Sequence, residues 1–206
     1  MKILLFFILL FTLQSCTTKK YTKMRLLPEG IKSATEEIYL VENNQKKLLQ
    51  KKEMVFTKNG RIKYSKTVDS LGNILQETEK KLWFVVEKYP NKEPYYCKTR
   101  WKPNQRERIS CYTQKQYKKN EAIYHYNSDE TIDKIVDNFT TFYTQYYFYT
   151  NKALSKIVIK DKNDILVDEV LISCETKDEK GTCSKEIRIS TKTNHKEEIL
   201  FSPIYE

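Results

Sequence analysis

The sequence predicts an all-β protein: an antiparallel meander of short hairpins that forms one curved sheet or an open sandwich. Two observations predict this class. A short pattern recurs along the chain, in which an apolar residue is followed by five polar or turn-forming residues and then by Ile or Leu. The segments between these repeats are rich in Val, Ile, Tyr, Phe and Thr, which favour strands. The 206 residues are enough for one domain or two small ones, and we expect a single β-rich domain over residues 35–206.

The N-terminal segment is expected to lie outside this domain. Met1-Lys2 is a short positive start, and residues 3–13 form an uncharged, almost wholly apolar run. The run is too short to span a bilayer as a stable helix and has the length of a signal-peptide core. The chain is therefore predicted to be exported.

The four residues after the apolar run add a second signal. Residues 13–16, Leu-Gln-Ser-Cys, resemble the lipobox of bacterial lipoproteins, with Gln14 as a mild departure. The resemblance implies that residues 1–15 are removed, that Cys16 receives lipid, and that residues 16–34 form a tether. It also implies the outer membrane, because Thr17 stands where an Asp favours retention at the inner membrane. The alternative is an ordinary secretory signal with a chance cysteine.

The net charge of +10 bears on possible partners. In a cytosolic protein such an excess suggests nucleic acid, but an exported protein rarely meets any. The expected partners are the membrane, through the N-terminal lipid, and an envelope protein, acidic glycan or lipopolysaccharide. The alternative is a solvated, lysine-rich surface without a specific partner.

Strand-forming composition extends over most of the predicted domain. Residues 42–53 are the one further place where a short helix could form. The candidate strands are residues 37–41, 54–57, 81–87, 123–126, 157–160, 166–173, 185–190 and 198–201.

The repeated pattern predicts strand, tight turn and strand. Asn59-Gly60 and Gly72-Asn73 supply the backbone freedom that a two-residue hairpin turn needs. Residues 128–139 also admit a helix, with Ser128 as its cap. The related copy at 148–158 lacks caps and is rich in strand formers, which favours the strand. The pairs that bracket the turns are Phe56/Ile62, Val68/Ile74, Tyr126/Ile132, Phe148/Leu154 and Ile159/Ile165.

Two of the repeats, FTKNGRI (56–62) and VDSLGNI (68–74), are similar to the tyrosine-aspartate (YD) repeat of Rhs-type proteins. The other copies are degenerate, and the Tyr-Asp pair never occurs intact. The resemblance implies a ribbon of consecutive antiparallel hairpins. With so few units, the chain is not expected to close the shell that the large members of that family build.

Four cysteines remain besides the lipobox cysteine, and a turn separates the two members of each neighbouring pair. Export allows disulfides. We expect Cys97–Cys111 and Cys174–Cys183 bonds, each joining the two strands of one hairpin. Free thiols and a metal site are the alternatives, but the spacings do not match a zinc site.

Two segments are candidate binding surfaces. The first, residues 98–108, is expected to form a rigid cationic and aromatic projection at a hairpin tip. The second is the aromatic strand 139–150, which presents tyrosines for stacking on sugars or on a partner chain. The alternatives are a solvated hairpin and a central strand packed on both faces. The predicted contact residues are Arg100, Trp101, Lys102, Arg106, Arg108, Tyr143, Tyr147 and Tyr149.

No motif in the sequence supports catalysis. His125 and His195 are isolated, and no phosphate loop, nucleophile elbow or zinc-protease motif is present. We therefore expect no enzyme, no cofactor and no metal. The leading prediction is a lipid-anchored envelope protein with a scaffolding or partner-binding role. The alternatives are a periplasmic inhibitor or immunity-type protein and a carrier of lipid or another hydrophobic ligand.

Overall fold

A computed structural model describes Leu27 and residues 30–43, 45–102 and 106–206, with the side chains of Lys102 and Arg106 outside the description. Cys16 and the rest of the predicted signal lie outside the described residues. Within these ranges no helix is long and apolar enough to cross a membrane. The strands that the structure describes are β1 (Ile31–Glu42), β2 (Gln45–Phe56), β3 (Ile62–Asp69), β4 (Ile74–Lys80), β5 (Val85–Lys88), β6 (Tyr95–Lys102), β7 (Arg106–Tyr112), β8 (Lys118–Tyr126), β9 (Ile132–Asp137), β10 (Thr144–Thr150), β11 (Ala153–Lys160), β12 (Leu166–Lys177), β13 (Cys183–Ser190) and β14 (Lys196–Tyr205).

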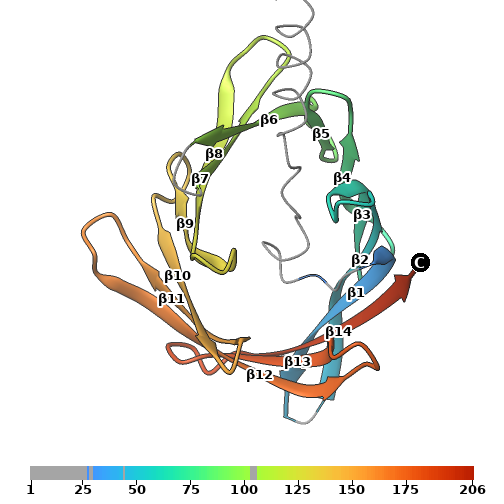
Figure 1. Ribbon diagram of the computed structural model, residues 1–206, viewed down its shortest axis with the longest axis vertical. Coiled ribbons are helices and arrows are strands. Elements are labelled where there is room, and N and C mark those ends of the chain that lie inside the picture. Colours follow the sequence, from blue (N-terminus) through green and yellow to red (C-terminus); the bar gives the residue numbers. More distant parts are fainter. Residues whose placement is uncertain (1–26, 28–29, 44, 103–105) are drawn as a thin grey trace, which may run out of the picture.

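The strands form an antiparallel meander that closes into a barrel (Figure 1). Each strand pairs with the next along the chain, and β1 also pairs with β14 from Ile31 opposite Tyr205 to Val41 opposite Lys196. The predicted all-β meander is confirmed. The expected curved sheet or open sandwich is corrected to a closed barrel, because the long terminal strands pair with each other and leave no edge.

Six of the loops share one hydrogen-bond pattern. In the first, the N–H of Thr57 donates to the carbonyl of Arg61 at 2.8 Å, and the N–H of Gly60 donates to the carbonyl of Thr57 at 2.8 Å. This is a three-residue hairpin loop whose last residue has a positive φ. The loops begin at Thr57, Asp69, Thr113, Asn127, Asp161 and Asp178, and their positive-φ residues are Gly60, Gly72, Gln116, Glu130, Asp164 and Gly181.

The three-residue loops correct the expected two-residue turns. The first residue of each loop is Thr, Asp or Asn, and in most of the loops its side chain accepts a backbone N–H from within the loop. Asp69 Oδ1, for example, accepts the N–H groups of Leu71 and Asn73 at 2.9 Å. These hydrogen bonds stabilise the three-residue loop. They form only when one more residue separates the strands than in a two-residue turn.

The repeated pairs mark the ends of strands, as the sequence predicts. Phe56 and Ile62, Val68 and Ile74, and Tyr126 and Ile132 are direct cross-strand partners. The other two pairs are displaced: Leu154 lies opposite Tyr149, and Leu166 rather than Ile165 begins its strand.

Both segments for which the sequence also admits a helix are strands in the structure. Residues 42–53 fall mainly in β2, and residues 128–139 contain β9. The long-range pairing of β2 with β1 and β3 outweighs the local helical preference of the lysine-rich segment.

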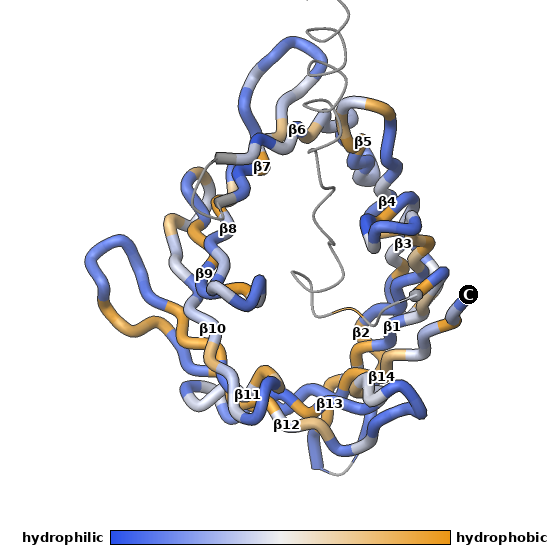
Figure 2. The backbone as a smooth tube through the Cα atoms, in the orientation of Figure 1, coloured by the Kyte–Doolittle hydropathy of each residue, from blue (hydrophilic) through white to orange (hydrophobic). Residues whose placement is uncertain are grey.

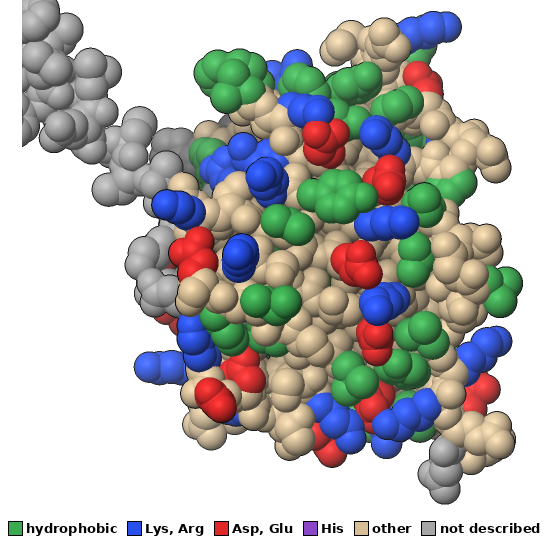
Figure 3. Space-filling view, turned by 90° about the vertical axis from the view of Figure 1, so that its right-hand side faces the viewer, with side chains coloured by type: hydrophobic (Ala, Val, Ile, Leu, Met, Phe, Trp, Pro, Cys, Tyr) green, Lys and Arg blue, Asp and Glu red, His purple; other side chains and the backbone are tan. Residues whose placement is uncertain are grey.

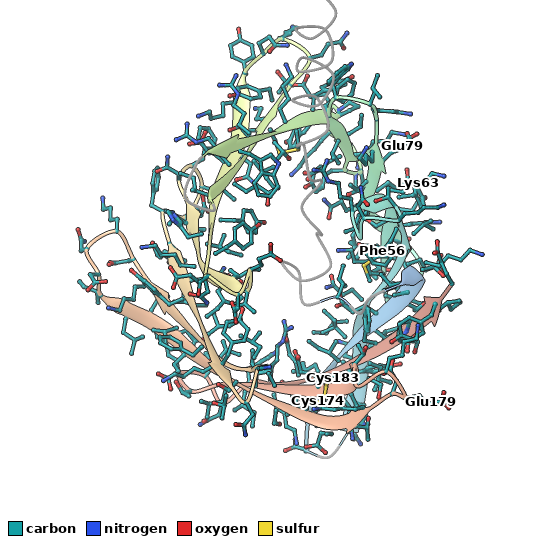
Figure 4. All side chains as sticks on the ribbon, in the orientation of Figure 1. Phe56, Lys63, Glu79, Cys174, Glu179 and Cys183 are labelled. Carbon is teal, nitrogen blue, oxygen red and sulfur yellow. A yellow bond between two sulfur atoms is a disulfide. The ribbon has the colours of Figure 1, made fainter. Side chains whose placement is uncertain are left out.

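The barrel has an inner and an outer face. Figure 4 places Phe56 on the inner side of the wall and Glu79 on the outer side. Successive residues of a strand alternate between the faces, and direct cross-strand partners share a face. Figure 2 shows the corresponding alternation of hydrophobic and hydrophilic residues along many strands.

The outer face of β1 to β4 is charged. Figure 3 shows acidic and basic side chains interspersed with hydrophobic ones on this side of the molecule. Lys51 Nζ lies 3.5 Å from Glu37 Oε1 across the β1–β2 pair. The buried carboxylate of Glu198 pairs with Lys46 at 2.5 Å and Lys185 at 3.5 Å on the same face. The outer face of these strands and their neighbours therefore carries paired charges of both signs.

Two hydrophobic clusters lie on the inner face. The first centres on Ile31, Ala34, Met54 and Phe56, near the start of β1. The second centres on Tyr126 and Ile132, on the far side of the barrel, and is described below. Among the described residues, buried apolar side chains therefore form two separate clusters on the inner face.

The structure contains two disulfides, in the pairing predicted from sequence. Cys97 is bonded to Cys111, its direct cross-strand partner on β6 and β7. Cys174 is bonded to Cys183 across the β12–β13 hairpin. Each bond closes a short loop and fixes one hairpin of the wall.

Candidate functional site: the aromatic inner wall

The register of the barrel places Trp101 on the inner face. From Met54, beside Phe56 on the inner face of β2, the direct partners are Ser65 and then Thr78 and Glu87. Val85, on the same face of β5 as Glu87, pairs with Cys97, which shares a face of β6 with Trp101. The aromatic ring therefore lies inside the barrel.

Trp101 starts a row of inner-face residues that crosses seven strands. Each member is the direct cross-strand partner of the next, so all share one face. The row contains four aromatic or aliphatic residues and three polar ones. It runs through Trp101, Glu107, Tyr124, Ile135, Gln145, Ile159 and Asp168.

A cluster of aromatic and aliphatic side chains forms around this row on β6, β8, β9 and β10. We call it the inner aromatic cluster. Its two buried members pack against four that are only half-buried. The rings of Trp101 and Tyr126 stack with centroids 6.4 Å apart. The cluster consists of Trp101, Tyr124, Tyr126, Ile132, Ile135 and Tyr147.

A single carboxylate lies within the cluster. Glu107 is 1% exposed, and the Tyr126 hydroxyl donates to its Oε2 at 2.6 Å. Glu107 also lies directly opposite Trp101 on the paired strand. Burying a carboxylate among rings is costly unless it is hydrogen-bonded, and the Tyr126 hydroxyl supplies such a bond.

The apolar inner surface continues from the cluster along the wall. Tyr147 on β10 lies opposite Ile157 on β11, which in turn lies opposite Val170 on β12. All three side chains point inward and yet stay only half-buried. The part of the inner wall formed by β10 to β12 is therefore not fully covered by the protein's own described side chains.

We call the half-buried apolar side chains that run from Trp101 through Tyr147 and Ile157 to Val170 the apolar strip. The strip ends at a polar pocket of about 280 Å³. Val170 belongs to both, and its partner Ser190 donates to Asp168 Oδ2 at 2.9 Å. Arg188 Nε donates to Glu186 Oε1 at 2.6 Å. The pocket is lined by Asp168, Val170, Arg188, Ser190, Thr193, His195 and Glu197. The inner wall thus joins an apolar strip to a polar, charged end.

Tyr149 lies near the end of β10, beside the inner aromatic cluster. Burial, reinforced by its neighbour Tyr147, raises the pKa of its hydroxyl to about 12. The hydroxyl donates to the backbone carbonyl of Ile132 at 2.9 Å. Tyr149 therefore stays neutral at physiological pH and serves as a hydrogen-bond donor.

The predicted aromatic surface divides between the faces of β10. Tyr147 and Tyr149 face inward, whereas Phe148 is exposed on the outer face, with Lys156 Nζ 5.2 Å from its ring centroid. Tyr143 lies outside the strand, in the β9–β10 loop. These tyrosines therefore do not form one platform.

The predicted cationic surface divides in the same way. Trp101 faces inward, and Arg100 and Arg108 lie side by side on the outer face as direct partners. Lys102 and Arg106 are strand residues whose side chains lie outside the description. Because β6 and β7 are regular strands, alternation separates Trp101 from the arginines.

Of the six residues of the inner aromatic cluster, the sequence predicts only Trp101 and Tyr147 as contact residues. Tyr124 and Ile135 carry no local motif, and only the register of β8 and β9 brings them opposite each other. The sequence marks Tyr126 and Ile132 only as repeat positions. It places Glu107 within the predicted cationic and aromatic hairpin 98–108. The available signal was the spacing of Tyr124 and Tyr126, which lie two positions apart and therefore share one face of a strand.

One group in the described residues has the composition of a metal site, namely Glu87, Cys97 and Cys111. The two cysteines are joined in a disulfide and cannot act as thiolate ligands. The group therefore has no metal-binding role in this oxidised state.

Comparisons with known proteins give structural matches of low score and low sequence identity. No family model matches the chain, and no curated protein matches it either. A LolA superfamily protein from Nitrosomonas europaea is 9% identical, with a TM-score of 0.41 over 92% of this chain and 90% of that one. A DUF1329 family protein from Desulfovibrio piger is 12% identical, with a TM-score of 0.36 over 85% and 86%.

A porin-like protein from Bacteroides uniformis is 8% identical, with a TM-score of 0.38 over 80% of this chain and 56% of that one. All three TM-scores lie below 0.5, so these likenesses carry no inference about function. The functional argument comes from the inner wall of the barrel.

Proposed function

We propose that the protein binds a hydrophobic or amphipathic molecule against the inner wall of the barrel and acts as a carrier of it. The observation that supports this is the half-buried apolar strip that runs from Trp101 through Tyr147 and Ile157. Inward-facing apolar side chains that their own protein leaves uncovered gain free energy when an apolar ligand covers them.

The layout of the strip favours an amphipathic ligand. An acyl chain covers Tyr147, Ile157 and Val170, and a polar head reaches the pocket that contains Ser190 and Arg188. Ligand sites commonly combine an apolar lining with a few polar groups that fix orientation. The ligand class that fits is a fatty acid or a related single-chain lipid.

The two tryptophans allow a direct test. Trp83 is 82% exposed, whereas Trp101 belongs to the inner aromatic cluster. The Trp83→Phe variant therefore keeps one reporter on the inner wall. Titration with the fluorescent fatty acid cis-parinaric acid should give saturable energy transfer from Trp101, and oleate should reverse it.

Neighbouring residues of β10 provide a matched pair of variants. Tyr147→Lys places a charge on the inner face, and Phe148→Lys places the same charge on the outer face. The first should weaken binding by about tenfold, equivalent to ~1.4 kcal/mol, and the second should leave it unchanged. No energy transfer, or equal weakening by both variants, would overturn the proposal.

A second candidate is binding of an acidic envelope protein, as a scaffold or an inhibitor, at the outer face of β6 and β7. Nε of Arg108 is buried without a hydrogen-bond partner, next to the like-charged Arg100. An acidic partner would neutralise the two adjacent guanidinium groups. Charge reversal at Arg100 and Arg108 should abolish capture of such a partner from crosslinked cells. Unchanged capture excludes this candidate.

The lipobox at residues 13–16 supports a location at the outer membrane, with lipid on Cys16 as the anchor. A carrier anchored in this way works within reach of a membrane. Metabolic labelling with an alkyne fatty acid tests the anchor: wild-type chain should be labelled, and the Cys16→Ser variant should not.

A further inference from the structure

The loops of the barrel divide between its two ends. In an antiparallel meander, successive loops open at opposite ends, so the loops after β1, β3, β5, β7, β9, β11 and β13 share one end. Ile31, where β1 begins, lies at the other end. We call the end formed by these seven loops the distal rim.

Large apolar side chains project from the distal rim. They lie on four of its loops, and each is between 36% and 85% exposed. Exposed apolar residues are ordinary when scattered, but gathered at one end they mark an interaction surface. The residues are Leu71, Tyr117, Phe139, Phe142, Tyr143, Ile165 and Leu166.

These side chains are held outward by ordered turns. Asp137 accepts the N–H groups of Phe139, Thr140 and Thr141 at 2.8–2.9 Å, and Phe142 takes a positive φ of 57°. A bulky residue seldom adopts that conformation. The hydrogen bonds to Asp137 therefore stabilise a loop conformation in which the Phe142 side chain is 49% exposed to solvent.

A pocket of about 420 Å³ opens on the same rim. Its lining combines the apolar Phe142, Tyr143 and Leu166 with the charged Asp161, Lys162 and Lys192. Within the part of the chain that the structure describes, neither lysine forms an ion pair. The pocket thus combines apolar contacts with two lysines and one carboxylate, and that carboxylate, Asp161, accepts the N–H groups of Asn163 and Ile165 within its own loop.

We propose that the distal rim docks onto the surface of an anionic lipid bilayer. Aromatic and aliphatic side chains on loops favour the boundary between headgroups and acyl chains, and adjacent lysines are attracted to anionic lipid. Lys162 and Lys192 contact lipid phosphates, and Phe142 and Leu166 enter the interface. This surface is separate from the inner wall and from any N-terminal anchor.

The opposite end of the barrel provides an internal control. Leu82 and Trp83 are 81% and 82% exposed there, on the single loop between β4 and β5. They are as apolar and as accessible as the rim residues. A docking mode that only follows exposed apolar area would involve both ends, whereas the proposed mode involves one.

The test places one tryptophan at either end of the full chain. A Leu166→Trp variant in a background with Trp83→Phe and Trp101→Phe reports on the distal rim. The Trp101→Phe variant, which keeps Trp83, reports on the opposite end. Both are mixed with phosphatidylcholine–phosphatidylglycerol vesicles whose acyl chains carry bromine, which quenches tryptophan only on contact. The comparison between ends holds whatever attaches the N-terminus.

The rim reporter should shift to shorter wavelength and be quenched, and Trp83 should remain unquenched. Phosphatidylcholine vesicles alone should quench the rim reporter far less. Adding Lys162→Glu and Lys192→Glu should lower its affinity for the anionic vesicles by about tenfold or more. A Tyr117→Trp reporter repeats the test on a second rim loop, in case the first variant does not fold.

Three results would overturn the proposal. They are no quenching at the rim, equal quenching at both ends, and rim quenching that is unchanged by Lys162→Glu and Lys192→Glu. Rim variants that bind an envelope protein but no vesicle would also overturn it, since the occupant is then a protein. The cis-parinaric acid titration involves no vesicle, so failure here leaves the carrier proposal standing.

Discussion

Glu121 offers the sharpest test of how the distal rim is held. It is 4% exposed on β8, and its carboxylate accepts three hydrogen bonds. Ser110 Oγ and Lys118 Nζ donate to Oε2, and Asn138 Nδ2 donates to Oε1, each at 2.9 Å. Asn138 begins the β9–β10 loop, and its N–H also donates to the Glu121 carbonyl at 2.9 Å. The carboxylate thus ties that rim loop to the wall.

The contribution of Glu121 to the free energy of unfolding follows from the pKa of its carboxyl group. Burial alone would raise the pKa of Glu121, but the hydrogen bonds from Asn138, Lys118 and Ser110 and the charge of Lys118 lower it to about 2. Compared with the ordinary value of 4.5, the difference corresponds to about 3 kcal/mol. Because the folded pKa is depressed, this stability is present above pH 4.5 and is lost as pH falls towards 2.

Urea unfolding of the wild-type chain and Glu121→Gln, followed by circular dichroism between pH 7 and pH 2, measures this contribution. The variant should be less stable by ~2–3 kcal/mol at neutral pH, and the two curves should converge at the acid end. Glu53→Gln, on the exposed outer wall of β2, serves as the control and should change little. A gap that persists undiminished at low pH would refute the reasoning.

Three further changes test the wall and its turns. Replacing Cys97 and Cys111 by Ser should lower the free energy of unfolding by about 3 kcal/mol, since their sequence separation is 14; an equal urea midpoint for the reduced and oxidised wild-type chain would contradict this. Tyr126→Phe removes the donor to buried Glu107 and should cost ~1.5–3 kcal/mol in thermal unfolding, and an unchanged Tm would argue against that bond. Gly72→Ala should cost about 1 kcal/mol through its φ of +85° alone, because no atom lies within 4 Å of the added Cβ; a larger loss measured in urea would indicate a clash.

Local chemistry made much of the wall predictable. Positions of positive φ in hairpin loops favour Gly, Asn or Asp, so the Gly-containing segments 57–61 and 69–73 were recognisable as turns. Cysteines that flank a turn are brought together by the hairpin itself, so Cys97–Cys111 and Cys174–Cys183 followed from their spacing. Both inferences depend only on residues close together in the sequence.

The candidate site could not be found in this way. The position of Trp101 opposite Glu107, and of Tyr124 opposite Ile135, depends on strand register. A slip by one residue would turn every side chain of a strand to the other face. Treating 98–108 as one cationic and aromatic surface ignored that alternation, which sends Trp101 inward and Arg100 outward.

The sequence by itself determined the strand content, most of the turns, both disulfides and a candidate lipidation site, because each is encoded within about twenty residues. Only the tertiary structure decided that the meander closes. The pairing of Ile31–Val41 with Lys196–Tyr205 joins segments at opposite ends of the described chain, and no local signal specifies it. Closure creates the inner wall and gathers loops from distant parts of the chain into one rim. The carrier proposal and the docking proposal both depend on that long-range pairing.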